Sequence, residues 1–137
     1  MRNRHRGFTL LEVLTVTGMV AVVSAVALPA YFRAVERSRQ TEGAFVLSLI
    51  RASELRYEAE NRTFTARWID LDIQNPNLLP PERRYFRYEL VNADEADFEA
   101  FARRRGRITL NPLYRYQLTI HRAGAIVEEP VMEPDNG

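Results

Sequence analysis

The sequence contains no cysteine and no lysine, and only two histidines. Without cysteine the chain has no disulfide framework and no thiolate chemistry, so an exported domain would hold its core by packing alone. The sequence also lacks the HExxH, GxSxG and glycine-rich phosphate-loop motifs, which carry metal, nucleophilic and phosphate chemistry. We therefore expect a protein that is not an enzyme, with no catalytic residue, no metal site and no cofactor.

Charge is nearly absent from residues 8–32, where Glu12 is the single charged residue. The run of about 25 residues measures roughly 38 Å as a helix, enough to cross a bilayer core of about 30 Å. It is longer than the apolar region of a cleaved secretory signal, which has about 7–15 residues, so we interpret it as a membrane anchor. A lone carboxylate in such a segment costs about 2.5–3.5 kcal/mol when unpaired, and Glu12 therefore needs a functional explanation.

The positive charge is concentrated in front of this run. The leader, residues 1–7, contains three arginines and no acid. The remaining 16 of the 19 arginines stand against 18 acids, a net charge of −2. Positive residues on the N-terminal side of a membrane segment favour a cytoplasmic N-terminus. We expect a single-pass membrane protein whose later residues lie on the other side.

Residues 33–61 predict an amphipathic helix that continues the membrane segment. Pro29 removes a backbone donor near the junction, so a kink is expected there. The apolar stripe expected to face a partner sheet consists of Phe45, Leu49, Ala52 and Leu55, with Val46 and Ile50 beside it. The charged residues expected mostly on the other faces are Glu36, Arg39, Glu42, Arg51, Glu54 and Glu58.

After the helix, residues 62–84 predict a loop punctuated by prolines and asparagines, with a short turn near residues 68–71. Alternating apolar and polar residues then predict strands at 85–91, 97–103, 114–120 and 125–127. Such strands form an antiparallel meander, which we place over residues 85–128 and follow with a loose tail at 129–137. The predicted fold class is α+β, with a long N-terminal helix whose second half packs on a small antiparallel sheet.

Two polar clusters have a functional and a structural interpretation. Oxygen ligands of the kind that calcium prefers are offered by Asp70, Asp72, Asn75 and Asn77. Their spacing is not that of an EF-hand, and we favour a solvated loop. A second cluster has the positive charge needed to contact DNA phosphates or another polyanion. It consists of Arg103, Arg104, Arg105 and Arg107. Acids between residues 94 and 99 can neutralise this cluster, so we favour a solvated turn and do not expect nucleic-acid binding.

The N-terminal residues stand in a specific order: Gly7, Phe8, Thr9, Leu10, Leu11 and Glu12, then an apolar run that ends in Leu28, Pro29, Ala30 and Tyr31. This order resembles the class III signal of type IV pilins and type II secretion pseudopilins. It is more specific than hydropathy because it fixes a glycine, an aromatic residue, a glutamate and a proline in sequence. The resemblance implies cleavage between Gly7 and Phe8 by a prepilin peptidase, N-methylation of Phe8, and a role for Glu12 in assembly.

The resemblance implies that Glu12 pairs with the terminal amine of a neighbouring subunit. Physical arguments support such a pair. After cleavage the amine of Phe8 and the side chain of Glu12 are four residues apart, on one face of a helix. Glu12 also lies near the positive end of the helix dipole. Neither effect offsets burial in hydrocarbon, so a cation from another subunit is a reasonable partner. If only one axial offset between neighbouring helices pairs the carboxylate, the carboxylate sets the register of the subunits, as buried polar residues do in coiled coils.

The implied function is that of a structural subunit of a type IV pilus-like filament. The subunit would be anchored in the bacterial inner membrane before it joins an extracellular pilus or a periplasmic filament. The expected partners are further copies, other pilins, the prepilin peptidase and an inner-membrane assembly platform. Two alternatives stay open: a type II secretion pseudopilin, and a minor tip pilin that binds DNA or a surface. The absence of a Pro-Trp-Gly-like segment before the sheet favours the pilin, while adhesion, motility, uptake and secretion are not distinguished.

Overall fold

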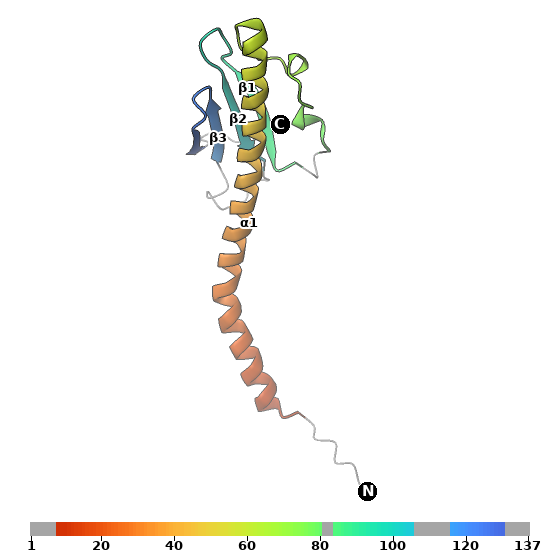
Figure 1. The fold of residues 1–137 in the computed structure, drawn as a ribbon. Coiled ribbons are helices and arrows are strands. Elements are labelled where there is room, and N and C mark those ends of the chain that lie inside the picture. The colour runs from red at the N-terminus through yellow and green to blue at the C-terminus, as the bar shows by residue number, and fades with distance from the viewer. Residues whose placement is uncertain (1–7, 81–83, 106–115, 131–137) are drawn as a thin grey trace. The chain divides into compact units, whose positions relative to one another are not determined.

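The computed structural model describes residues 8–80, 84–105 and 116–130. A long helix, α1 (Leu10–Asn61), precedes two short 3-10 helices, η1 (Trp68–Asp70) and η2 (Pro76–Leu78). The strands that follow are β1 (Phe86–Val91), β2 (Glu99–Arg104), β3 (Tyr116–His121) and β4 (Ile126–Pro130) (Figure 1). A long N-terminal helix followed by an antiparallel sheet is the α+β class predicted from the sequence, which is thereby confirmed.

The chain divides into two compact units, residues 1–38 and 39–137, and each is described by itself. In the first unit, α1 is continuous through Pro29, and the kink expected at this residue stays a prediction. In the second unit, α1 ends at Asn61 because Arg62 adopts a left-handed conformation with φ at 60°. The Arg62 amide still donates to the Glu58 carbonyl at 2.7 Å, which closes the last turn of the helix. The second unit is called the head below.

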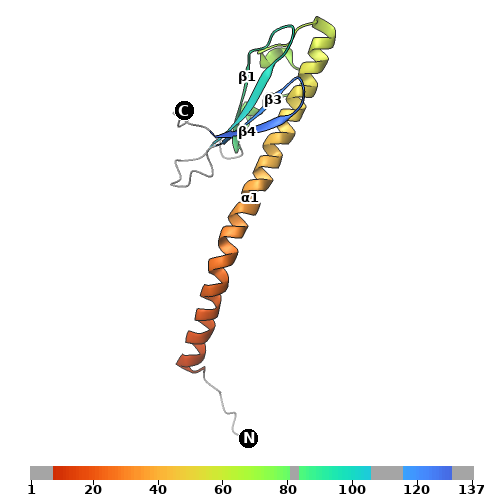
Figure 2. The ribbon, with the colours of Figure 1, turned by 90° about the vertical axis from the view of Figure 1, so that its left-hand side faces the viewer.

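The sheet of the head is an antiparallel meander in the order β1-β2-β3-β4 (Figure 2). Alternate side chains of the strands point to one face of a sheet, and here one face is buried. Its buried residues are Phe86, Tyr88, Ala100, Ala102, Tyr116, Leu118 and Ile120. These side chains form a single core with Leu47 and Ile50 of α1, so the core of the head lies between one helix and one sheet.

Strand β2 starts two residues later than the alternation of apolar residues predicts, at Glu99. The residue before the strand, Phe98, is buried in the core. Asp97 prevents an earlier start because its carboxylate accepts hydrogen bonds from the amides of Phe98 and Arg122, both at 2.9 Å. Turn chemistry therefore determines where this strand begins.

Strand β4 is longer than the predicted segment 125–127 and extends through Pro130. In the register with β3, Glu129 pairs with Gln117, and Pro130 pairs with Tyr116. A proline is tolerated at this place because β4 is the last strand of the described sheet, where a missing N–H breaks no further ladder. Residues 114 and 115 of the third predicted strand and residues 131–137 of the predicted tail lie outside the described residues.

The face of α1 that packs on the sheet matches the predicted stripe only in part, because Ile50 is buried and Val46 and Leu55 pack against the core. Leu47 and Ile50 are fully buried, whereas Phe45 and Leu49 are 63% and 44% exposed. The predicted core positions of Phe45 and Leu49 are therefore wrong, because the helix turns the face that carries Leu47 and Ile50 toward the sheet.

Gly43 gives the physical reason for this orientation. A Cβ atom at Gly43 would lie 3.0 Å from the ring of Phe86 and 3.1 Å from the side chain of Leu118. The missing side chain lets the sheet approach the helix backbone here more closely than any other residue would allow. Because Phe45 is two residues further along, a rotation of about 200° at 3.6 residues per turn, its ring points away from the core.

The long loop between α1 and β1 is held against the head by hydrogen bonds. The Phe64 amide donates to the Asp94 carbonyl at 2.9 Å, and the ring of Phe64 packs on Phe98 with centroids 5.2 Å apart. Further along, Asn77 in η2 makes two hydrogen bonds with the backbone of Tyr88 in β1. The turn predicted near residues 68–71 is present as η1.

Candidate functional site

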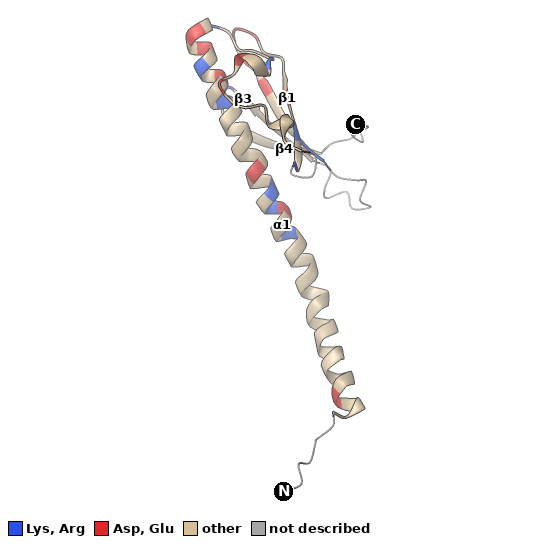
Figure 3. Cartoon of the chain, turned by 90° about the vertical axis from the view of Figure 1, so that its right-hand side faces the viewer, with Lys and Arg blue, Asp and Glu red and all other residues tan. Residues whose placement is uncertain are grey.

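The N-terminal part of α1 has a continuous apolar surface. Its large apolar side chains, from Phe8 to Phe32, are between 53% and 84% exposed. This stretch is long and apolar enough to cross a membrane, and none of its most apolar window is buried within the chain. In Figure 3 it is tan apart from one red segment near its start. Apolar surface of this extent requires lipid or another protein as its neighbour.

Two hydroxyl groups within this stretch are satisfied inside the helix. Thr15 Oγ1 donates to the Leu11 carbonyl at 2.8 Å, and Thr17 Oγ1 donates in the same way to the Val13 carbonyl. A hydrogen bond to the carbonyl four residues earlier avoids the free-energy cost of an unpaired hydroxyl group in hydrocarbon. The two threonines are therefore compatible with a membrane environment without any partner.

Thr9 caps the N-terminus of α1. Its Oγ1 accepts a hydrogen bond from the Glu12 amide at 3.3 Å, and its carbonyl accepts from the amides of Glu12 and Val13 at 3.1 and 3.2 Å. Thr9 and Glu12 stand three residues apart, the spacing of the capping box in which a threonine precedes a glutamate. This cap was not predicted above, although the Thr-x-x-Glu spacing is a sufficient signal for it.

The side chain of Glu12 is exposed in the first turn of α1. Within the described residues it makes no ion pair, so the single chain supplies no cation for it there. The carboxylate can accept hydrogen bonds and balance a positive charge brought by another molecule. Its position near the helix N-terminus adds a favourable dipole interaction of about 0.3–1 kcal/mol, less than its cost in hydrocarbon.

The residues at the predicted cleavage point are Gly7 and Phe8. Phe8 is 77% exposed and precedes the first residue of α1, whereas Gly7 lies outside the described residues. In the uncut chain the Phe8 nitrogen belongs to a peptide bond and carries no charge. Cleavage would create an amine four residues before Glu12, which is one helical turn. The peptidase site and the methylation site stay predictions.

The arginine cluster predicted for polyanion contact has three described members, while Arg107 lies outside the described residues. Arg103 stacks on the ring of Phe101 at 5.6 Å. Arg104 lies over the ring of Tyr85 at 5.7 Å and donates to its carbonyl at 3.1 Å, and Arg105 donates its amide to the same carbonyl at 2.8 Å. These contacts fix the ends of β1 and β2, and polyanion binding stays an untested prediction.

The oxygen-rich loop predicted as a weak calcium alternative is occupied by protein contacts. Asp72 accepts hydrogen bonds from Arg56 at 2.7 and 2.8 Å and one from Ser53, and these bonds lower the pKa of Asp72 to about 2. Asp70 accepts from the Thr65 hydroxyl at 2.9 Å. The described residues contain no group of three or more acids or histidines arranged to hold a metal ion.

Glu54 occupies a place that the sequence analysis did not foresee. It was expected on a polar face of α1, yet its side chain is fully buried in the head. Its Oε2 accepts the Thr65 amide at 3.1 Å, which ties the loop to the helix. Its Oε1 has no hydrogen-bond partner within the described residues. Burial raises the pKa of Glu54 to about 6; the Thr65 bond lowers it, and nearby Asp70 raises it further.

Residues 2–28 match the family model described as the prokaryotic N-terminal methylation motif. No curated protein matches the chain. The matched segment contains Thr9, Glu12 and most of the exposed apolar surface described above, and it is the signal of type IV pilins and pseudopilins. The chain thus carries this signal, which implies processing by a prepilin peptidase and assembly into a pilin polymer. Together with the apolar part of α1 it fits anchoring in a membrane.

Proposed function

We propose that this chain is the structural subunit of a type IV pilus-like filament. The observation that supports the proposal most directly is the lone carboxylate of Glu12 on an exposed apolar helix, inside the matched signal. Residues 8–32 hold the subunit in the inner membrane before assembly, with residues 1–7 in the cytoplasm and the head exported. In the filament the same apolar residues face other copies of the helix, which replaces lipid contacts by protein packing.

The proposed mechanism of assembly begins with hydrolysis of the Gly7–Phe8 peptide bond. The new amine of Phe8 is methylated and keeps its positive charge. The carboxylate of Glu12 in one subunit then pairs with the Phe8 amine of a neighbour inside the bundle. An unpaired carboxylate inside the bundle costs about 2.5–3.5 kcal/mol. Axial offsets between neighbouring subunits that leave Glu12 unpaired are therefore disfavoured.

Membrane and filament fractions of cells with and without the prepilin peptidase test this function. The chain is expected in filaments sheared from the surface of cells that have the peptidase, and in the membrane alone without it. A chain that reaches the same fraction in both cells contradicts the proposal. Because pseudopilins share the signal, the fraction also decides between the two classes: recovery from the periplasm and not from the surface favours the secretion pseudopilin.

A further inference from the structure

The loop between α1 and β1 is anchored to the sheet at two places. Before residue 65, the Phe64 amide donates to the Asp94 carbonyl at 2.9 Å, and the Phe64 ring packs on Phe98. After residue 72, the side chain of Asn77 bonds both backbone groups of Tyr88. Residues 65–72, called here the latch segment, lie between these anchors. A displacement of the latch segment away from α1 would therefore leave both anchors and the sheet intact.

Two carboxylates hold the latch segment on α1. Inside the head, Glu54 Oε2 accepts the Thr65 amide at 3.1 Å. At the surface, Asp72 accepts two hydrogen bonds from Arg56 at 2.7 and 2.8 Å and one from Ser53. The bonds from Arg56 and Ser53 lower the pKa of Asp72 to about 2, so the surface contact stays charged between pH 4 and pH 7.

Apolar packing holds the latch segment less firmly than it holds the sheet. Leu71 is buried but is not part of the main core. Trp68 is only partly buried against that core, and Ile69 is 81% exposed. Segments with few buried apolar contacts open at a lower free energy than core strands. The contacts made by Glu54 and Asp72 therefore have a large share in keeping the segment closed.

The contact made by Glu54 changes with pH. The ionised carboxylate strengthens the bond to Thr65, but the carboxylate is fully buried and its Oε1 has no hydrogen-bond partner within the described residues. A buried charge that is only partly hydrogen-bonded is costly. Burial raises the pKa of Glu54 from 4.5 to about 6 although the Thr65 bond lowers it, and the charge of Asp70 raises it further.

Within the described residues, no ion pair joins Glu54 to a cation. The charged groups around it are engaged with one another, in the pairs Arg56–Asp72, Arg67–Asp70, Arg122–Glu58 and His121–Asp97. On α1 itself, Arg51 donates to the Arg122 carbonyl at 2.9 Å. The titratable side chains buried on the described strands are Tyr88 and Tyr116, and tyrosine phenols titrate near pH 10. Histidine is the side-chain type that titrates near neutral pH, so His121 needs a control of its own.

We propose that residues 65–72 are a pH-operated latch of the head, closed in acid and released when the buried Glu54 carboxylate ionises. Release admits water to Glu54 and uncovers the Thr65 amide and Leu71, which the closed segment buries. A surface is thus exposed in neutral surroundings and withdrawn in acidic ones. The latch lies in the head alone, so it goes beyond the proposed function and does not depend on filament assembly.

The sign and size of the effect follow from proton linkage. The Glu54 carboxyl binds its proton more tightly in the closed segment than in the open, solvated one. The stabilisation of the closed state is therefore complete below pH 4.5 and is lost as the pH rises through 6. Between pH 4 and pH 7 the equilibrium constant for opening rises about 20-fold.

Amide hydrogen exchange of the full chain in detergent tests the latch. The Thr65 amide is bonded to Glu54 in the closed segment, so it exchanges when the segment opens. Amides of the β2–β3 ladder report unfolding of the whole head. Each rate is divided by the intrinsic rate at the same pH to give a protection factor. We expect Thr65 to be less protected than the ladder, with a protection factor that falls about 20-fold from pH 4 to pH 7.

Three variants separate the latch from a purely structural contact. Glu54→Gln keeps an acceptor for Thr65 and removes the charge, so it should abolish the pH dependence at Thr65. Asp72→Asn should lower the protection of Thr65 by a similar factor at both pH values and preserve the difference of about 20-fold between them. His121→Gln should also preserve that difference.

Three results overturn the proposal. The first is a Thr65 amide as well protected as the ladder, because the segment would then open only with the whole head. The second is an unchanged pH dependence in Glu54→Gln, and the third is its loss in His121→Gln. If Glu54→Gln does not accumulate, the wild-type chain and His121→Gln decide the question: a fall of less than about threefold between pH 4 and pH 7 in either one refutes the latch.

Discussion

The amide of Glu12 donates hydrogen bonds to both oxygens of Thr9, to Oγ1 at 3.3 Å and to the carbonyl at 3.1 Å. The Glu12 side chain has a second role at this spacing, because a glutamate three residues after a capping threonine can bond the amide of the threonine and stabilise the helix start. The loss of filaments on replacing Glu12 by leucine, which is expected to leave membrane insertion intact, would therefore combine two effects. A variant that separates the cap from the charge is more informative.

Glu12→Gln is that variant. Glutamine suits this position of a capping box as glutamate does, but it cannot pair with an amine as an anion. We expect unchanged amounts of the chain in the membrane and at least about tenfold less in sheared filaments, a difference that corresponds to about 1.4 kcal/mol. Glu12→Asp keeps the charge and serves as control, with assembly closer to that of the wild type. Glu12→Gln filaments at wild-type yield would show that the charge is not needed for assembly.

Glu54→Gln tests the buried carboxylate of the head. The pKa of Glu54 is raised from 4.5 to about 6, so the folded state binds a proton more tightly than the unfolded state. Stability from this group is complete below pH 4.5 and is lost as the pH rises through 6, a loss of about 2 kcal/mol at most. Glutamine keeps the acceptor for Thr65 and removes the charge, so this variant should be more stable than the wild type at pH 7 and equally stable at pH 4.

Urea unfolding of the detergent-solubilised chain measures this difference. Trp68 is the single tryptophan and packs against the core, so its fluorescence reports on the head. A control at an exposed acid of the same helix, Glu42→Gln, should not change the pH dependence. Equal stability of wild type and Glu54→Gln at both pH values would mean that the buried carboxylate is not destabilising.

Asn77→Ala tests how the loop is joined to the sheet. The Asn77 side chain accepts the Tyr88 amide at 3.0 Å and donates to the Tyr88 carbonyl at 2.6 Å, as a neighbouring strand would. Loss of both bonds should destabilise the head by about 1–3 kcal/mol, because each net hydrogen bond contributes about 0.5–1.5 kcal/mol. Asn75→Ala removes the bond to the Asn77 amide and leaves the bonds to Tyr88 intact, so its effect should be smaller. An unfolding midpoint of Asn77→Ala equal to that of the wild type would show that the loop is held by other contacts.

The features that were predictable from the sequence are those that arise from local patterns. The lone Glu12 in an apolar run, and the alternation of residues such as Phe86, Tyr88 and Leu90, depend on near neighbours in the chain. They gave the membrane-length helix, the strands and the fold class. The order of residues around Gly7 and Phe8 gave the processing signal, which the motif match supports.

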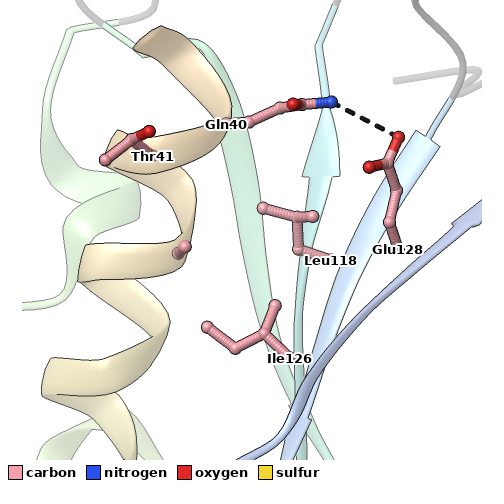
Figure 4. A pocket seen from close by; sticks show the side chains of 6 residues that line it. Gln40, Thr41, Leu118, Ile126 and Glu128 are labelled. Carbon is pink, nitrogen blue, oxygen red and sulfur yellow. Dashed lines mark hydrogen bonds between the residues drawn. The ribbon is translucent and has the colours of Figure 1, made fainter. Parts of the chain in front are cut away.

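The features that were not predictable arise from contacts between distant segments. Phe45 and Leu49 have the periodicity of a core stripe, but Gly43 decides which face of α1 the sheet approaches, through Phe86 and Leu118. Nothing near Glu54 in the sequence indicates burial, because its partner Thr65 comes from the loop. An open hollow on the head likewise brings Gln40 of α1 beside Leu118 of β3 and Ile126 of β4 (Figure 4). Such contacts are determined by tertiary packing, and local sequence patterns do not predict them.

The central claim is that Glu12 acquires its partner when the chain is cut before Phe8, and the mature N-terminus tests it most directly. The measurement is N-terminal sequencing together with the intact mass of the chain from sheared filaments. If Glu12 pairs with the terminal amine, the chain from filaments begins at Phe8, lacks residues 1–7 and carries one methyl group on that amine. Filament material that still begins at Met1 would contradict it, because Glu12 would then have no terminal amine one helical turn before it to pair with.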